Sequence, residues 1–174
     1  ERISTEMLKA LDSINPQLFF EFLAGCDGLT DWFPELIDRN FAFSSVDSID
    51  RFCELDLEKK SFESLVKRLK LSKKYLVASR HWSTFGGLIK NWRRSPKEEL
   101  YDCLCKTNFF HDDSNLQRLL NLASKHGSYE LEELENILNK LAEMDFEPRR
   151  SELVGEALGR QIRESRIQWL RSQY

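Results

Sequence analysis

The sequence has little of the residues that interrupt helices and build turns. Its 174 residues include seven glycines and four prolines, too few for a collagen-like or low-complexity chain, or for a β-sandwich with many turns. No apolar run approaches the roughly 18 to 20 residues that cross a bilayer, so we expect no membrane partner. The chain starts at Glu1 without an initiator methionine or an apolar signal segment. We interpret this start as the cut end of a larger polypeptide.

The motifs of common active sites are also missing. There is no P-loop and no G-x-S-x-G nucleophile elbow. The four cysteines and three histidines do not have the spacing of zinc ligands, and His111-Asp112 alone does not supply the ligand set of a metal-dependent phosphohydrolase. We therefore predict no catalytic residue, no metal site and no cofactor in this chain, and reduced, mostly buried thiols of the kind found in cytoplasmic proteins.

The overall charge excludes one class of nucleic-acid-binding protein. Hydrophobic residues make up 41% and charged residues 32%, a globular composition, and 26 Lys and Arg against 29 Asp and Glu give a net charge of −3. A uniformly basic protein that coats nucleic acid is excluded by this balance, whereas a local basic patch is compatible with it.

Hydrophobic spacing predicts an all-α fold of about eight or nine helices. The spacing of Ile3, Met7 and Ile14 predicts an amphipathic helix at the N-terminus, and Pro16 can open the next helix. We expect the buried face of that second helix to contain Phe19, Phe20, Phe22 and Leu23. Residues 32–36 form a short apolar turn around a proline, and residues 39–46 are irregular and polar, the best candidate for a boundary.

Further helices are expected along the rest of the chain. A helical pattern over 72–94 is broken at Gly86-Gly87, Asp113-Ser114 offers an N-cap, and Ser128 can open a helix whose many glutamates make it acidic. The remaining helices are expected at 47–57, at 60–71, from Lys97, and from about Glu152 to the C-terminus.

Acidic residues are absent from one long window, residues 64–96. That window carries nine positive charges and one histidine, and the remainder of the chain has 17 basic and 29 acidic residues. We select the nine cations as candidate phosphate contacts of an RNA-binding surface: Lys67, Arg68, Lys70, Lys73, Lys74, Arg80, Lys90, Arg93 and Arg94.

Aromatic residues are interleaved with these cations. Tyr75, Trp82 and Trp92 could stack on bases or ribose, as in proteins that bind single-stranded or terminal RNA. The alternative is that the cations are solvated on helix faces while the aromatic rings lie in the core. The acidic helix would then be solvated too, or would face away from a polyanion.

Four segments of the chain resemble the motifs of one known family. Residues 1–9 are similar to its E-R-I-x-x-E-L-x-K helix, and Leu23 with Gly28-Leu29 and residues 32–36 resemble its G-L-x-x-L-F-P-E-L signature. Residues 62–75 resemble L-x-x-R-L-x-x-P-x-x-Y, with Ser72 where proline is usual, and residues 155–167 resemble the closing G-x-x-I-G-x-x-L-x-x-x-R-I helix. The middle of the chain, about 76–131, matches only in helical character. The family that these motifs resemble is that of the bacterial tRNA nucleotidyltransferases (CCA-adding enzymes) and poly(A) polymerases.

The resemblance implies a division of labour within a larger enzyme. Members add C, C and A to tRNA 3′ ends from CTP and ATP with Mg²⁺, and are built as a head, neck, body and tail. The metal carboxylates and nucleotide-selecting motif of the head are absent here, as are the ligand histidines of the phosphohydrolase module that many relatives carry. The resemblance therefore implies an inactive helical portion that holds the tRNA acceptor and TΨC arm for an N-terminal nucleotidyltransferase head.

The family resemblance also implies how the chain is divided into parts and what its first helix does. The expected parts are neck-type RNA-binding helices over 1–38, a helical body over 47–145 and a C-terminal tail helix over 146–174. Arg2, Glu6 and Lys9 are expected to tie the neck helix to the head, although Arg2 and Glu6 are also spaced for a simple helix ion pair. Three alternatives stay open: the same region of a poly(A) polymerase, a degenerate relative that only binds RNA, and a helical protein-interaction module.

Overall fold

The computed structural model describes residues 2–126, 131–144 and 155–173, and all regular structure in these residues is helical. Nine helices of seven or more residues confirm the all-α prediction; α3 and the 3₁₀ helix η1 are shorter. The bounds are α1 Arg2–Asp12, α2 Gln17–Gly25, α3 Gly28–Trp32, η1 Pro34–Leu36, α4 Ser48–Glu54, α5 Lys59–Leu69, α6 Lys73–Lys90, α7 Lys97–Lys106, α8 Ser114–Lys125, α9 Leu131–Glu143 and α10 Glu156–Arg171. Ser128 and Glu152, the expected starts of the last two helices, lie outside the described residues.

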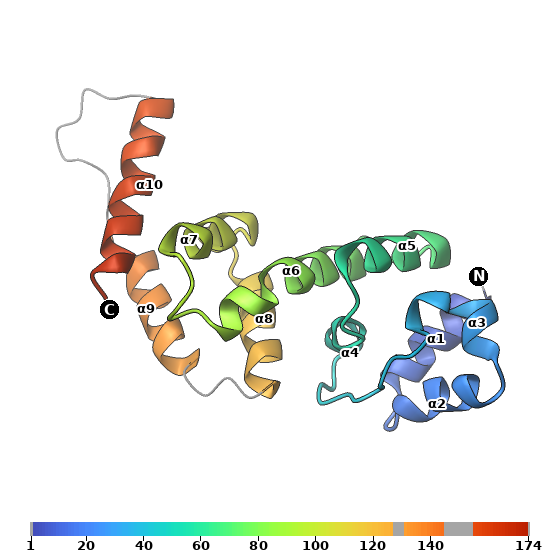
Figure 1. The fold of residues 1–174 in the computed structure, drawn as a ribbon. Coiled ribbons are helices and arrows are strands. Elements are labelled where there is room, and N and C mark those ends of the chain that lie inside the picture. Colours follow the sequence, from blue (N-terminus) through green and yellow to red (C-terminus); the bar gives the residue numbers. More distant parts are fainter. Residues whose placement is uncertain (1, 127–130, 145–154, 174) are drawn as a thin grey trace.

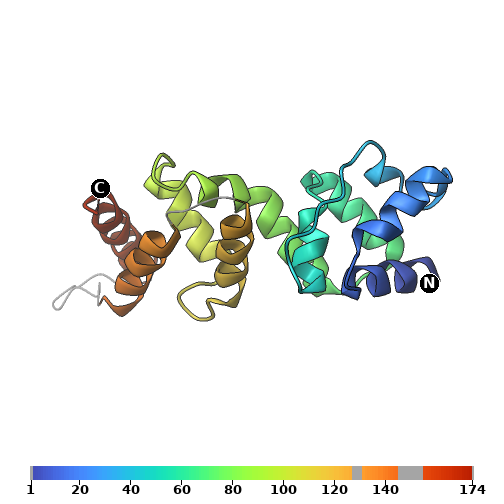
Figure 2. The same cartoon turned by 90° about the horizontal axis from the view of Figure 1, so that it is seen from below.

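The long helix α6 connects the two ends of an elongated molecule (Figures 1 and 2). It packs against α4 and α5 toward the N-terminal end and against α7 and α8 toward the C-terminal end. Helices α1 to α3 lie at one extremity, and α10, which contacts α7 and α9, lies at the other. The basic window of the sequence therefore covers the centre of the molecule, from the C-terminal half of α5 through α6.

The N-terminal helices surround an aromatic core but also expose apolar side chains. Phe20 is fully buried and stacks on Phe41 with ring centroids 4.8 Å apart. Two expectations for these helices were wrong: Phe22 is 72% exposed and Ile14, which lies beyond the end of α1, is 92% exposed. Phe22 follows Phe20 by two residues, so the two side chains cannot share one face of α2.

The irregular segment before α4 is held by buried charges. Glu54 of α4 is buried, and its carboxylate accepts hydrogen bonds from the backbone N–H and the hydroxyl of both Ser44 and Ser45. The buried Arg51 donates from Nε to the Ser45 carbonyl at 2.6 Å, and from Nη1 to the carbonyls of Leu11 and Ser13, both at 2.6 Å. Arg51 thus binds the C-terminal end of α1, where helix carbonyls lack helical partners. The proposed boundaries between 38 and 47 and near 145 stay predictions.

Helix α6 runs without interruption through Gly86-Gly87, where the sequence predicted a break. Gly86 is buried under the ring of Trp82, and a Cβ placed on it would lie 2.9 Å from Trp82 Cε3. The glycine therefore permits close packing of a side chain one turn earlier, and does not end the helix.

Two smaller expectations were also revised by the structure. Asp113 is the N-cap residue of α8, but its side chain makes no capping hydrogen bond; Asp112 Oδ1 instead accepts from the Ser114 N–H at 3.0 Å. Of the four thiols, Cys53 and Cys103 are buried but Cys26 and Cys105 are exposed. Among the described residues, no helix is both long and apolar enough to cross a membrane.

Candidate RNA-binding surface

The turn between α5 and α6 concentrates four of the candidate cations. Lys67 lies in the last turn of α5, Lys70 is its C-cap, and Lys73 and Lys74 form the start of α6. All four are exposed, and within the described part of the chain none of them forms an ion pair. We refer to these four lysines as the α5–α6 lysine cluster.

Lys70 has a backbone conformation that usually belongs to glycine. Its φ is 53° and its ψ is 40°, in the left-handed region, and it ends α5 with the Leu71 N–H donating to the Val66 carbonyl at 3.0 Å. Glycine is the usual residue at this position of such a helix end, because a Cβ is unfavourable there. A lysine is therefore present at some cost to stability, which is a pattern common at functional positions.

This cost makes Lys70→Gly an informative variant. We expect it to raise the free energy of unfolding by about 0.5–1 kcal/mol, because glycine relieves the left-handed strain, and yet to weaken RNA binding by removing one cation. Urea unfolding and tRNA binding, measured on the same preparation, check the expected gain in stability and the expected loss of binding. Lys60→Gly, inside the first turn of α5, is the control and should lower stability. A Lys70→Gly protein that is less stable, or that binds RNA as well as the parent, would contradict this prediction.

Arg68 joins two of the segments that carry the family resemblance. Its Nη2 donates to Glu35 Oε2 at 2.5 Å, its Nε to Glu35 Oε1 at 3.3 Å and its Nη1 to the Trp32 carbonyl at 2.7 Å. Glu35 is the acid of the Pro-Glu-Leu motif, which forms η1 as the predicted turn. The guanidinium is thus used to hold α5 against η1, and a phosphate contact by Arg68 stays a prediction.

Two further candidates are paired with acids from outside the acid-free window. Arg80 Nε donates to Glu63 Oε1 at 2.8 Å, and Arg93 Nη2 forms an ion pair with Glu133 of the acidic helix α9. The surface formed by this window therefore does contain acidic partners, because the fold places a glutamate from outside the window beside each of these two arginines. Lys90 and Arg94 are exposed near the C-terminal end of α6.

The interleaved aromatic residues lie in the core, so the expectation that they stack on RNA was wrong. Tyr75 and Trp82 are each 4% exposed and Trp92 is 1% exposed. Lys74, Lys90 and Arg93 lie over these three rings, respectively, at 5.5, 4.7 and 5.1 Å from the ring centroids. Cation–π contacts hold these three positive charges over the buried rings. The rings themselves are not available for stacking on bases.

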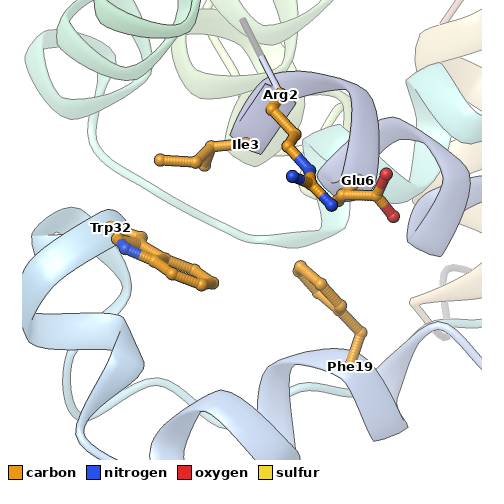
Figure 3. A pocket seen from close by; sticks show the side chains of 5 residues that line it. All are labelled: Arg2, Ile3, Glu6, Phe19 and Trp32. Carbon is orange, nitrogen blue, oxygen red and sulfur yellow. The ribbon is translucent and has the colours of Figure 1, made fainter.

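The motif residues of α1 border a separate cavity of about 540 Å³ near the N-terminus. Figure 3 shows Arg2, Ile3 and Glu6 on one side, with Phe19 of α2 and Trp32 of α3 projecting into the same space. Glu6 pairs with Lys9 at 3.0 Å. A contact of Arg2, Glu6 and Lys9 with another domain stays a prediction.

Three arginines of α10 contact residues of α7 and of the segment that follows it. Arg163 pairs with Asp102 of α7 at 3.2 Å, Arg171 pairs with Glu98, and the Arg166 guanidinium lies 4.0 Å from the centre of the Phe110 ring. These are structural contacts of a basic helix that resembles the closing motif of the family.

The sequence analysis did not include residues at the start of α8 in the candidate surface. Packing of α8 on α6 brings Ser114, Asn115 and Arg118 next to Lys73 and Lys74. None of the three lies in the basic window, and only the shared hydrophobic faces of the two helices relate them to it. No local motif in the sequence indicates this proximity.

Taken together, the described residues form a helical scaffold with a lysine-rich centre. Among them, no group of three His, Cys, Asp or Glu side chains comes together to hold a metal ion. The described residues thus present exposed cations on a helical framework.

Comparison with known proteins found similarity to curated CCA-adding enzymes. The chain is 24% identical over 186 aligned residues to the CCA-adding enzymes of two Coxiella burnetii strains, RSA 331 (Henzerling II) and RSA 493 (Nine Mile phase I). The alignment covers 99% of this chain and 50% of each relative, so the chain spans about half the length of the curated relatives it matches. No protein-family model and no solved structure matches the chain. The chain is thus distantly similar to a portion of a CCA-adding enzyme.

Proposed function

We propose that this chain is the tRNA-binding helical C-terminal portion of a CCA-adding tRNA nucleotidyltransferase. The observation that carries the proposal is the alignment of 99% of the chain with half of a CCA-adding enzyme, together with motif segments in the family's order. The α5–α6 lysine cluster supports it, because exposed lysines without ion-pair partners among the described residues suit a polyanionic ligand.

In this proposal the chain binds and positions RNA while another domain performs the chemistry. The helical frame presents the lysine cluster to the acceptor and TΨC arm, and phosphate contacts fix the register of the RNA without reading its sequence. Recognition then depends on the shape of the A-form duplex. The described residues do not fit a Mg²⁺ site, so Mg²⁺, CTP and ATP would be bound by the head. A cytoplasmic location is part of the same proposal.

In this proposal the head contacts the chain at the N-terminal cavity. Arg2 and Glu6 border this cavity beside Phe19 and Trp32, and Trp32 is 44% exposed. A charged rim next to exposed aromatic surface is typical of an interface between domains. We therefore keep Arg2, Glu6 and Lys9 as the residues that tie the first helix to the head.

A salt titration of tRNA binding tests the proposed function. We expect the chain to bind fluorescently labelled tRNA at low salt, with log K falling linearly with log salt at a slope that corresponds to about three to six phosphate contacts. Duplex DNA of equal length should compete poorly, because its backbone geometry differs from that of A-form RNA.

Two results would contradict the proposal. Absence of binding at low salt would favour a helical protein-interaction module, and equal competition by duplex DNA would indicate nonspecific binding of polyanions. Binding of tRNA by a chain whose complete enzyme extends poly(A) would instead assign it to a poly(A) polymerase, which shares the same motifs.

A further inference from the structure

A second cavity opens between the first turns of α6 and α8, beside the lysine cluster. It has a volume of about 360 Å³, at the small end of the range of ligand sites. Its polar lining consists of Lys73 and Lys74 from α6 and of Ser114, Asn115 and Arg118 from α8. Three cations, a hydroxyl and an amide therefore border one cavity, contributed by two helices whose first residues are 41 positions apart in the sequence. We call it the α6–α8 cavity.

Arg118 is fixed in position by two carboxylates of α4 and its cap. Its Nη1 donates to Asp47 Oδ1 at 2.8 Å and also to Asp50 Oδ1. Burial raises the pKa of Asp50. Burial alone would raise the pKa of Asp47 too, but the hydrogen bonds from Arg118 and the Asp50 backbone outweigh it and lower that pKa. Asp47 and Asp50 thus orient the guanidinium at the edge of the cavity and leave its other nitrogens for a further partner.

The lysines supply the positive charge that the carboxylates do not neutralise. Lys73 has no ion-pair partner among the described residues, and the Lys74 ammonium lies over the Tyr75 ring, 5.5 Å from its centroid. Among the described residues, three cations and no acidic side chain line the cavity; Asp47 and Asp50 contact Arg118, and Asp112 accepts a hydrogen bond from the Ser114 N–H. Lysine, arginine, serine and asparagine side chains are the groups with which proteins bind phosphate and sugar oxygens of nucleic acids.

We propose that the α6–α8 cavity binds one backbone phosphate of the RNA, held by Lys73, Lys74, Asn115 and Arg118. This inference rests on the proposed function, and it extends the predicted surface from α5 and α6 to α8. The phosphate track then runs from Lys67 and Lys70 at the end of α5 to a cavity whose α8 residues lie outside the basic window.

An isosteric pair of variants on α8 tests the cavity. Asn115→Asp places a negative charge in it. The substitution removes the 3.4 Å hydrogen bond from Asn115 Nδ2 to the Thr107 carbonyl, but an acid is favourable near a helix start, so we expect the fold to be retained. We expect tRNA binding to be about three- to tenfold weaker at low salt. The slope of log K against log salt should fall by the amount that corresponds to about one phosphate contact. Asn121→Asp adds the same charge on an exposed part of α8 outside the cavity and should bind within about twofold of the parent chain. Circular dichroism and thermal unfolding confirm the fold of each variant.

A titration with inorganic pyrophosphate at constant ionic strength separates this inference from the proposed function. We expect saturable shifts of the backbone amide resonances of Lys73, Lys74, Ser114 and Asn115 in the parent and in Asn121→Asp, but not in Asn115→Asp. If the parent binds tRNA and Asn115→Asp binds it as tightly as Asn121→Asp, the cavity inference is overturned and the proposed function stands. If the parent does not bind tRNA, saturable shifts support a phosphate site without the proposed function, and their absence overturns both.

Discussion

Replacing Arg51 by alanine is expected to lower the free energy of unfolding by about 3–5 kcal/mol, the range typical of breaking a buried charged network. The guanidinium donates to three carbonyls at 2.6 Å each, two at the end of α1 and one in the segment before α4. Alanine would leave these carbonyls without their donor. It would also release Ser45, the residue that donates to Glu54. Urea unfolding of both proteins measures the difference.

The matched control for Arg51 is Arg39. Arg39 is exposed and donates a single 3.4 Å hydrogen bond to the Asp56 carbonyl, so Arg39→Ala should change stability by less than about 0.5 kcal/mol. Arg51→Lys should recover only part of the stability, because an ammonium cannot reach three carbonyls in the geometry of a planar fork. A loss below about 1 kcal/mol for Arg51→Ala would show that the three bonds contribute little.

Charge reversal of Lys67 and Lys70 together is expected to weaken tRNA binding about tenfold or more, and to reduce the salt slope by about two contacts. Both side chains are exposed and neither has an ion-pair partner among the described residues, so the double variant Lys67→Glu with Lys70→Glu should fold normally. The salt titration of binding gives both quantities, and thermal unfolding verifies the fold.

The control for this pair lies at the other end of the same helix. Lys59 and Lys60 are exposed in the first turn of α5, so reversing both charges changes the net charge of the protein by the same amount. Lys59→Glu with Lys60→Glu should bind tRNA more tightly than the Lys67/Lys70 double variant by at least about fivefold, because only nearby charges act through a screening layer of roughly 8–10 Å. Equal loss in the two double variants would show that binding follows net charge and not the lysine cluster.

The helices could be predicted from the sequence because their hydrophobic spacing is local. Met7 and Leu11, for example, lie one turn apart, and both are fully buried. The site could be predicted only as far as composition allows: the acid-free window located the exposed lysines, but not the glutamates that pair with Arg68, Arg80 and Arg93.

The features that could not be predicted from the sequence depend on contacts between distant segments. Arg51 and Glu54 have the residue types of a solvated helix face, and their burial follows from the segment that folds over α4. Tyr75, Trp82 and Trp92 are compatible with either a stacking surface or a core, and only the packing of α4, α5 and α8 around α6 selects the core. Asn115 and Arg118 join the surface through that same packing.

Helix α6 begins with Lys73 and Lys74 and ends with Lys90. Its length sets the orientation of these first and last cations relative to each other. Its 18 residues span about 27 Å at 1.5 Å per residue, and each residue turns the helix by about 100°. One residue inserted between Lys74 and Lys90 would rotate the C-terminal cations by more than a quarter turn about the helix axis while moving them only slightly along it. The number of residues in α6 therefore fixes the angle about the helix axis between the cations at its two ends.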